Sequence, residues 1–164
     1  MKIAFIGYGN VGAPLASHPQ RLGHDVTLAA NDPSSETVKK ALAKNGSLTV
    51  ATPKDAVKAA EVVFLATPFR ANVEALKAVE KELIGKILVD CTNPVGPGLS
   101  HGLNNAQSGA YPAFNAKPVM MYCGRDPAAK TTVGELIAQL GWEPLDVGGL
   151  EQHQRKSAGD EWKP

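Results

Sequence analysis

The sequence predicts an α/β protein with a Rossmann-like, doubly wound and mainly parallel sheet in a single domain. Short runs rich in Val, Ile and Leu alternate with helical stretches, which is the pattern of parallel strands joined by helices. A glycine-rich turn follows the first of these runs directly and opens a helix. The chain has 164 residues, of which 43% are hydrophobic, enough for one domain with a buried core. We expect this domain to cover residues 1–150 and a polar C-terminal tail to cover residues 151–164.

Apolar runs and helix-end signals predict the elements in order. The expected strands cover residues 2–6, 25–29, 48–50, 61–66, 86–91, 118–123 and 143–147. The expected helices cover residues 10–22, 33–45, 53–59, 71–83 and 127–140. Gly23 is a typical residue just beyond a helix end, which stops the first helix. Asp32 is the expected N-cap of the second helix, with Pro33 as its first residue. Both faces of the strand over 61–66 are apolar, so we expect it to be buried.

Two features depart from this regular pattern. Pro19 lies inside the first helix, where it removes one backbone hydrogen bond and crowds the carbonyl four residues earlier. We therefore expect a kink or an early end there. Residues 93–117 show no hydrophobic period and are rich in Gly, Pro, Asn and Ser, which is long for a loop in a compact domain. In the helix over 71–83, Val73 and Val79 are expected on or near one apolar stripe.

The strongest chemical signal is a G-x-G-x-x-G motif in the context that the motif requires. It follows a strand, opens a helix, and consists of Gly7, Tyr8, Gly9, Asn10, Val11 and Gly12. The first glycine permits a tight turn, the second lets a pyrophosphate approach the backbone, and the third lets the helix pack closely on the strand. No acidic residue occurs between Met1 and His24, so no carboxylate competes for the helix N terminus. These residues are candidates for binding the pyrophosphate of NAD(P); a glycine-rich turn without a ligand is the alternative.

The adenosine ribose is expected to bind after the second strand, about 20 residues beyond the glycines. An acidic residue there favours the free 2′-hydroxyl of NAD, whereas a neutral or basic residue leaves room for the 2′-phosphate of NADP. Asn31 occupies the diagnostic position, because Asp32 is already explained as a helix cap. Ser34 and Ser35 add hydroxyl and N–H donors in the first helical turn, although no Arg is present. The sequence therefore favours NADP, with NAD as the alternative.

Small polar residues and prolines follow the fourth and fifth strands. Thr67 and Pro68 come after the fourth strand, and Thr92, Asn93 and Pro94 come after the fifth. In open parallel sheets ligands bind beyond the carboxyl ends of the strands, so these residues suit the nicotinamide and its ribose. Simple turn chemistry is the alternative, since Thr-Pro and Asn-Pro are common at loop starts.

Composition and spacing exclude several classes of function. The net charge is +1, from 17 Lys and Arg against 16 Asp and Glu, so neither nucleic acid nor an anionic membrane is an expected partner. Apolar stretches are far shorter than a membrane span requires. Cys91 and Cys123 form no CxxC or metal spacing, so we expect reduced thiols in a cytoplasmic protein and no metal site. The sequence shows no catalytic triad and no paired carboxylates, which fits hydride transfer between two bound redox cofactors.

Three segments together resemble one known family. They are MKIAFIGYGNVGAPLA at the N terminus, ATPF after the fourth strand, and VDCTNPVGPGLS around the end of the fifth. This combination is similar to the deazaflavin-dependent NADP oxidoreductases, of the coenzyme F420-dependent type. Their relatives include the cytosolic reductase domain of the six-transmembrane metalloreductases. The resemblance covers most of residues 1–103 and about 111–152. It implies pyrophosphate binding by Tyr8 to Val11, ribose binding by Asn31, and nicotinamide or substrate contacts by Thr67, Pro68, Asn93 and Pro94.

Together these patterns predict an oxidoreductase that binds NADP(H) and passes hydride to or from a flavin-like or deazaflavin acceptor. Thr67, Pro68 and Asn93 would position the nicotinamide, with no protein acid required. One alternative is a regulatory module that binds the dinucleotide without turnover, suggested by the polar tail and the lack of a proton-transfer group. The other is a shortened, inactive family member, suggested by Pro19 and the tail. The expected partner is a small-molecule redox acceptor, and the resemblance also implies a homodimer.

Overall fold

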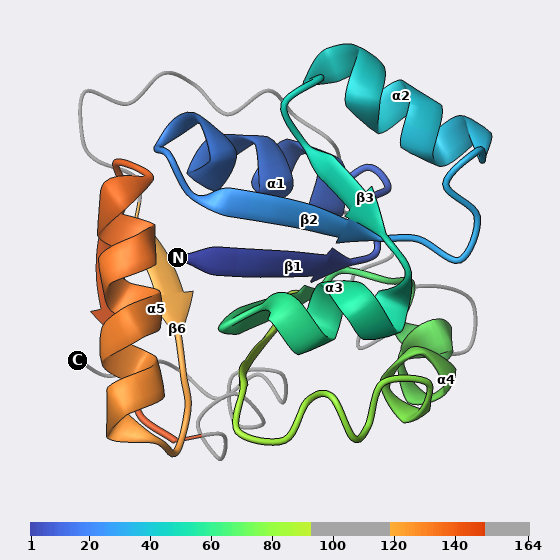
Figure 1. Ribbon diagram of the computed structural model, residues 1–164. Helices are drawn as coiled ribbons and strands as arrows, with labels where there is room; N and C mark the ends of the chain where they lie inside the picture. Colours follow the sequence, from blue (N-terminus) through green and yellow to red (C-terminus); the bar gives the residue numbers. More distant parts are fainter. Residues whose placement is uncertain (93–118, 150–164) are drawn as a thin grey trace, which may run out of the picture. The chain divides into compact units, whose positions relative to one another are not determined.

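The structure is a computed structural model that describes residues 1–92 and 119–149. The chain divides into two compact units, one within residues 1–93 and one within residues 94–164. The described part of the first unit contains a five-stranded sheet, and that of the second contains a two-stranded sheet (Figure 1). Every strand pair in both sheets is parallel. The predicted α/β fold with a mainly parallel, Rossmann-like sheet is thereby confirmed. The expected domain end at residue 150 and the tail over 151–164 lie outside the described residues and stay predictions.

The sheet of the first unit follows the doubly wound order β3-β2-β1-β4-β5. Its strands are β1 (Lys2–Ile6), β2 (Asp25–Ala29), β3 (Thr49–Ala51), β4 (Val62–Leu65) and β5 (Ile87–Asp90). Ile6, the last residue of β1, pairs with Ala29 of β2 on one side and with Leu65 of β4 on the other. The carboxyl ends of these three strands therefore meet at one edge. Since the strand order reverses beside β1, this edge is where an open α/β sheet binds its ligands.

Helices cover both faces of this sheet. They are α1 (Gly12–Arg21), α2 (Glu36–Lys44), α3 (Pro53–Ala59), the 3₁₀ turn η1 (Phe69–Ala71) and α4 (Asn72–Lys77). Figure 1 shows α1 and α3 on opposite sides of β1 and β2. Ala4 and Ile6 of β1 pack with Val57 of α3 in one core cluster, and the alternating residues Ile3 and Phe5 point to the other face. Packing on both faces fixes the register of β1 and hence the position of the turn that follows it.

Strand β4, which lies between β1 and β5, is as buried as its apolar sequence predicts. Val62 and Val63 are fully inaccessible to solvent, and Leu65 is 1% exposed. Phe64 stacks on Phe5 of the neighbouring β1, with ring centroids 4.7 Å apart. A strand buried on both faces is typical of a parallel sheet between two helix layers. The buried strand therefore fixes the position at which the loop after β4 begins.

The start of α2 differs from the sequence prediction. Ser35, not Asp32, is the N-cap, because the Val38 N–H donates to the Ser35 hydroxyl at 3.4 Å. Pro33 lies outside the helix, in a turn that the Ser35 N–H closes by donating to the Asp32 carbonyl at 3.2 Å. The reason is that the Asp32 carboxylate accepts hydrogen bonds from Ser34 instead of from the helix. The predicted helix start at Pro33 was therefore wrong by one turn, and Ser34 precedes the first helical turn.

Two further helix predictions need correction. α1 continues past Pro19 to Arg21, so the expected early end does not occur at Pro19 itself. The Pro19 ring is buried, which offsets part of the missing hydrogen bond. The helix expected over 71–83 ends at Lys77 and is followed by turns. Val73 is consequently 64% exposed whereas Val79 is fully buried, so these two residues do not share one helix stripe.

The second unit is a small parallel βαβ arrangement. It contains β6 (Val119–Tyr122), α5 (Pro127–Gln139) and β7 (Glu143–Asp146). Asp126 caps α5 by accepting a hydrogen bond from the Ala129 N–H at 2.8 Å, with Pro127 in the first helical turn as predicted. Lys130 of α5 forms an ion pair with Asp146 at the end of β7, at 2.8 Å. The cap defines the start of α5, and the ion pair joins α5 to β7.

Candidate dinucleotide site

The turn after β1 is closed against the end of β4 at Gly7. Gly7 has a φ of +94°, a conformation that other residues rarely adopt. A Cβ at this position would lie 2.6 Å from the carbonyl carbon of Ala66 and 2.7 Å from the backbone nitrogen of Thr67. Both the backbone conformation and the close approach of β4 therefore require glycine here.

Gly12 and Gly9 have opposite surroundings. A Cβ on Gly12 would collide with the carbonyl oxygen of Gly7 and lie 2.8 Å from the carbonyl carbon, so α1 starts in direct contact with the turn. A Cβ on Gly9 would meet no atom within 4 Å. Gly7 and Gly12 are thus required by the packing of the protein itself, whereas nothing in the described structure requires glycine at position 9. A group that approaches the backbone from outside would account for it.

The N terminus of α1 carries no side-chain partner of its own. Its N-cap is Val11, which makes no side-chain cap hydrogen bond, and no acidic residue lies in the first turn. Gly9, Asn10 and Val11 are exposed. Backbone N–H groups at a helix N terminus bind anions, assisted by the helix dipole. The turn therefore fits the pyrophosphate of a dinucleotide.

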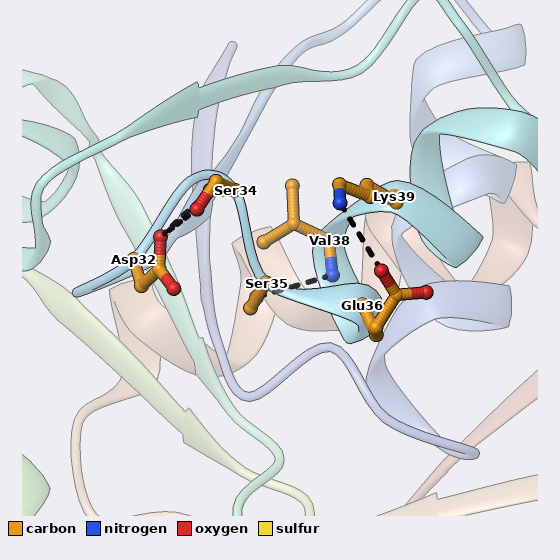
Figure 2. Close-up of polar contacts among 6 residues, drawn as sticks. All are labelled: Asp32, Ser34, Ser35, Glu36, Val38 and Lys39. Atoms are coloured by element: carbon orange, nitrogen blue, oxygen red, sulfur yellow. Dashed lines mark hydrogen bonds and ion pairs between the residues drawn. The ribbon is translucent and has the colours of Figure 1, made fainter.

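The loop after β2 gathers polar groups around Asp32 (Figure 2). The Ser34 N–H and the Ser34 hydroxyl both donate to Asp32 Oδ1, at 2.8 and 2.6 Å. The hydroxyl and then the N–H of Ser34 hold the pKa of this carboxyl below its usual value, so it is ionised at neutral pH. Figure 2 also shows Glu36 and Lys39, whose charged groups pair at 3.1 Å on the surface of α2. Asn31 is exposed beside Asp32.

A hydrogen-bonded bridge links the ends of β4 and β5. The Thr67 hydroxyl donates to Oδ1 of Asn72, the first residue of α4, at 2.7 Å. Nδ2 of Asn72 donates to the Thr92 hydroxyl, also at 2.7 Å. All three residues are half-buried. The bridge brings two hydroxyl groups to the sheet edge that carries the glycine turn.

The sequence predicts Thr67 as a site residue but gives no sign of Asn72. A polar residue at the start of a short helix looks like an ordinary turn residue, and no local pattern pairs it with Thr92. Pro68 is exposed and precedes η1. Asn93 and Pro94, the other candidates at this edge, lie outside the described residues.

Cys91, which directly follows β5, is not poised as a nucleophile. Its thiol, like that of Cys123, is free and half-buried. Burial, and next the charge of Asp90, raise the pKa of the Cys91 thiol to about 11, so it stays protonated at neutral pH. Within residues 1–92 and 119–149 no group of three His, Cys, Asp or Glu side chains could hold a metal ion. In the same residues no helix is both long and apolar enough to cross a bilayer.

Comparison with known proteins agrees with this geometry. The chain is 30% identical over 172 residues to metalloreductase STEAP3 of Rattus norvegicus, which covers 91% of the chain and 34% of that protein. It is 33% identical over 103 residues to the F420-dependent NADP reductase of Methanothermobacter marburgensis, which covers 58% of the chain and 46% of that protein. The chain thus spans less than half the length of these relatives.

A solved structure and a family match complete the comparison. A provisionally named F420-dependent NADP reductase from Arthrobacter sp. FB24 has the same fold, with a TM-score of 0.74 over 96% of this chain and 89% of that chain. At 24% identity this likeness concerns the fold alone. Residues 2–94, more than half of the chain, match the family described as NADP oxidoreductase, coenzyme F420-dependent. The chain therefore belongs to the coenzyme F420-dependent NADP oxidoreductase family.

Proposed function

We propose that this chain binds NADP(H) at the carboxyl edge of the five-stranded sheet and transfers hydride to or from a flavin-like or deazaflavin acceptor. The observation that carries the proposal is the contrast within the glycine turn. Gly7 and Gly12 are enclosed by backbone, whereas the position of a Gly9 Cβ is open. A turn that is closed toward the protein and open toward solvent, at an uncapped helix N terminus, suits a pyrophosphate. The family relation supports NADP, while the acceptor is part of the proposal.

Each part of the edge has a proposed role. The backbone from Gly7 through Tyr8, Gly9, Asn10 and Val11 to Gly12 binds the pyrophosphate. The loop with Asn31, Ser34 and Ser35 binds the adenosine ribose. Thr67, Pro68, Asn93 and Pro94 position the nicotinamide. The homodimer and the cytoplasmic location that the sequence suggests stay predictions.

The hydrogen-bond directions in the Asn72 bridge define what its hydroxyl groups can offer. The proton of the Thr67 hydroxyl is already donated to Asn72, so the oxygen of Thr67 is an acceptor for a ligand N–H. The oxygen of Thr92 accepts from Asn72, so its own proton is available for donation. An acceptor and a donor held by one side chain suit a carboxamide, which carries both kinds of group. The nicotinamide, when bound, supplies or receives the hydride, and the residues of this edge need only bind and orient it.

The test is an acceptor screen with a matched pair of variants. We expect the purified chain to oxidise NADPH with a deazaflavin, a flavin or a ferric acceptor. Gly9→Val should lower kcat/KM by at least about tenfold, because the new side chain fills the ligand side of the turn. Gly46→Val, at an exposed glycine after α2, is the control and should leave the rate unchanged. Retained NADPH binding in Gly9→Val would overturn the proposed site. Binding of NADPH without turnover of any acceptor would favour the regulatory module.

A further inference from the structure

Two exposed apolar side chains lie beside the Asn72 bridge, and the proposed dinucleotide contacts do not use them. Phe69 of η1 is 42% exposed, and Val73 of α4 is 64% exposed. Phe69 comes two residues after Thr67, and Val73 directly follows Asn72. Figure 1 shows α4 on the side of the sheet toward which the arrow of β1 points. Both residues therefore belong to the edge of the sheet that carries the candidate site.

The helical geometry of this segment makes the two side chains neighbours. The 3₁₀ turn η1 continues directly into α4, and the Asn72 N–H donates to the Phe69 carbonyl. Residues four apart in such a segment are adjacent on its surface, so Phe69 and Val73 form one apolar patch. The Asn72 side chain, which is hydrogen-bonded to the hydroxyl groups of Thr67 and Thr92, borders this apolar patch.

Packing of α4 on the sheet does not account for the apolar patch. The residues of α4 that pack against the core cluster include Ala75 and Leu76, whereas Glu74 and Lys77 are exposed. At 3.6 residues per turn, the apolar patch falls between the core-facing and the charged residues. A single exposed valine is ordinary, but an aromatic ring with a valine beside polar groups is typical of the lining of small-molecule sites.

From this placement we propose that the apolar patch of Phe69 and Val73 binds the planar ring of the hydride acceptor. A flavin-like ring is broad and flat, so it can stack on the Phe69 ring and pack on the Val73 methyl groups. Reacting atoms must approach to about 3–3.5 Å, so the acceptor ring must lie beside the nicotinamide. The apolar patch adjoins the Asn72 bridge, which is the proposed nicotinamide contact. The inference rests on the proposed function and adds to it the surface that binds the acceptor.

The test is a fluorescence anisotropy titration of riboflavin, a flavin without phosphate groups, with the full chain in excess NADP⁺. The oxidised dinucleotide fills its site without reducing the probe. Phe69→Ala should weaken riboflavin binding about tenfold because the stacking ring is lost, and Val73→Ala should weaken it about threefold. Phe69→Trp keeps a flat ring, so riboflavin affinity should stay within about threefold of the parent chain. Ile84→Ala is the matched control: Ile84 is 79% exposed and precedes the opposite, amino end of β5, so riboflavin affinity should not change.

Calorimetric titration of the same variants with NADPH separates this inference from the proposed function. Phe69→Ala should leave NADPH affinity unchanged, because the ring contacts the acceptor and not the dinucleotide. Equal riboflavin affinity in Phe69→Ala and Ile84→Ala, or no riboflavin binding to a parent chain that binds NADPH, overturns the inference and leaves the dinucleotide site intact. An equal loss of riboflavin and NADPH affinity in Phe69→Ala also overturns it. If the parent chain does not bind NADPH, the proposed function falls as well.

A second copy of the chain is the other occupant that an exposed apolar patch could bind. Sedimentation velocity of the parent chain and Phe69→Ala at equal concentrations tests it. We expect the same sedimentation coefficient for both. A dimer that dissociates in Phe69→Ala, with riboflavin affinity unchanged, would make the apolar patch an interface between copies and overturn its assignment to the acceptor.

Discussion

The turn after β1 and the loops after β4 and β5 lie at the same edge of one sheet, but they are held in different ways. The turn is held by close backbone contacts: Gly7 and Gly12 lie so near other backbone atoms that no side chain fits. The loops are held by side-chain hydrogen bonds, with Asn72 bridging the hydroxyl groups of Thr67 and Thr92. A substitution in the turn therefore forces backbone to move, whereas one in the bridge leaves polar groups without partners.

This difference assigns different kinds of function to the two regions. A turn whose shape depends on backbone contacts offers N–H groups in fixed directions, which suits an anion that is bound by shape and charge. In the loops, Asn72 orients the hydroxyl groups of Thr67 and Thr92 together, which suits the binding of a polar ring substituent in one orientation. Substitutions that alter the stability or the ligand binding of one region alone test this assignment.

Gly12→Ala should have the largest effect on stability. The new methyl group would collide with the carbonyl of Gly7, so α1 and the turn must separate. We expect the free energy of unfolding to fall by roughly 3 kcal/mol, measured by denaturant titration. Gly46→Ala is the control, since its Cβ would lie 3.8 Å from the nearest atom, the carbonyl oxygen of Leu42. Equal stability of the two variants would show that the turn does not depend on the close backbone contact between Gly12 and Gly7.

Asn72→Leu should come next. The substitution keeps the approximate shape but leaves the hydroxyl groups of Thr67 and Thr92 without their shared partner in a half-buried site. We expect a loss of about 2 kcal/mol in the free energy of unfolding. Val73→Ala, at the adjacent and 64% exposed residue, should change stability by less than about 0.5 kcal/mol. Equal free energies of unfolding for the two variants would show that the Asn72 bridge does not stabilise the fold.

Gly9→Ala separates ligand binding from folding within the turn. No protein atom lies within 4 Å of the added methyl group, so stability should stay within about 0.5 kcal/mol of the parent chain. NADPH affinity should fall about tenfold, or about 1.4 kcal/mol, because the methyl group stands where the pyrophosphate approaches. Calorimetry and denaturant titration of the same preparation measure both quantities. Unchanged affinity would remove the functional reason for glycine at this position.

Ser35→Ala should have the smallest effect. Its hydroxyl caps α2 through one hydrogen bond of 3.4 Å, so we expect a loss of about 0.5–1 kcal/mol in the free energy of unfolding. Asp32→Ala should cost less, since the hydrogen bonds that its side chain accepts in the described structure come from Ser34, in the turn before the helix. A larger loss of stability for Asp32→Ala than for Ser35→Ala would support Asp32 as the N-cap, as the sequence suggested.

The glycine turn could be predicted from the sequence because its causes are local. A strand, three glycines and a helix start lie within Lys2 to Gly12, and each glycine role follows from that order. The buried strand β4 could be predicted for the same reason, from a continuous apolar run.

Features that depend on distant segments could not be predicted. Asn72 gains its role only because β4 and β5 pair in parallel and bring Thr67 and Thr92 to one edge. The start of α2 was missed because Asp32, Ser34 and Ser35 are all residues that can cap a helix, and the choice among them depends on the geometry of the turn. The sequence predicts Val73 and Val79 on or near one helical stripe, but the chain leaves the helix at Lys77 between them.

The most direct test of the dinucleotide site is to map backbone amide resonances by NMR while NADPH is added to the ¹⁵N-labelled chain. The account predicts that the largest shifts fall on Gly9, Asn10, Val11 and Gly12, with smaller shifts at Thr67 and Thr92. It further predicts that the resonances of these turn amides do not shift when NADPH is added to the Gly9→Val variant. Shifts confined to other parts of the chain, with the four turn amides unchanged, would contradict a pyrophosphate site at the N terminus of α1.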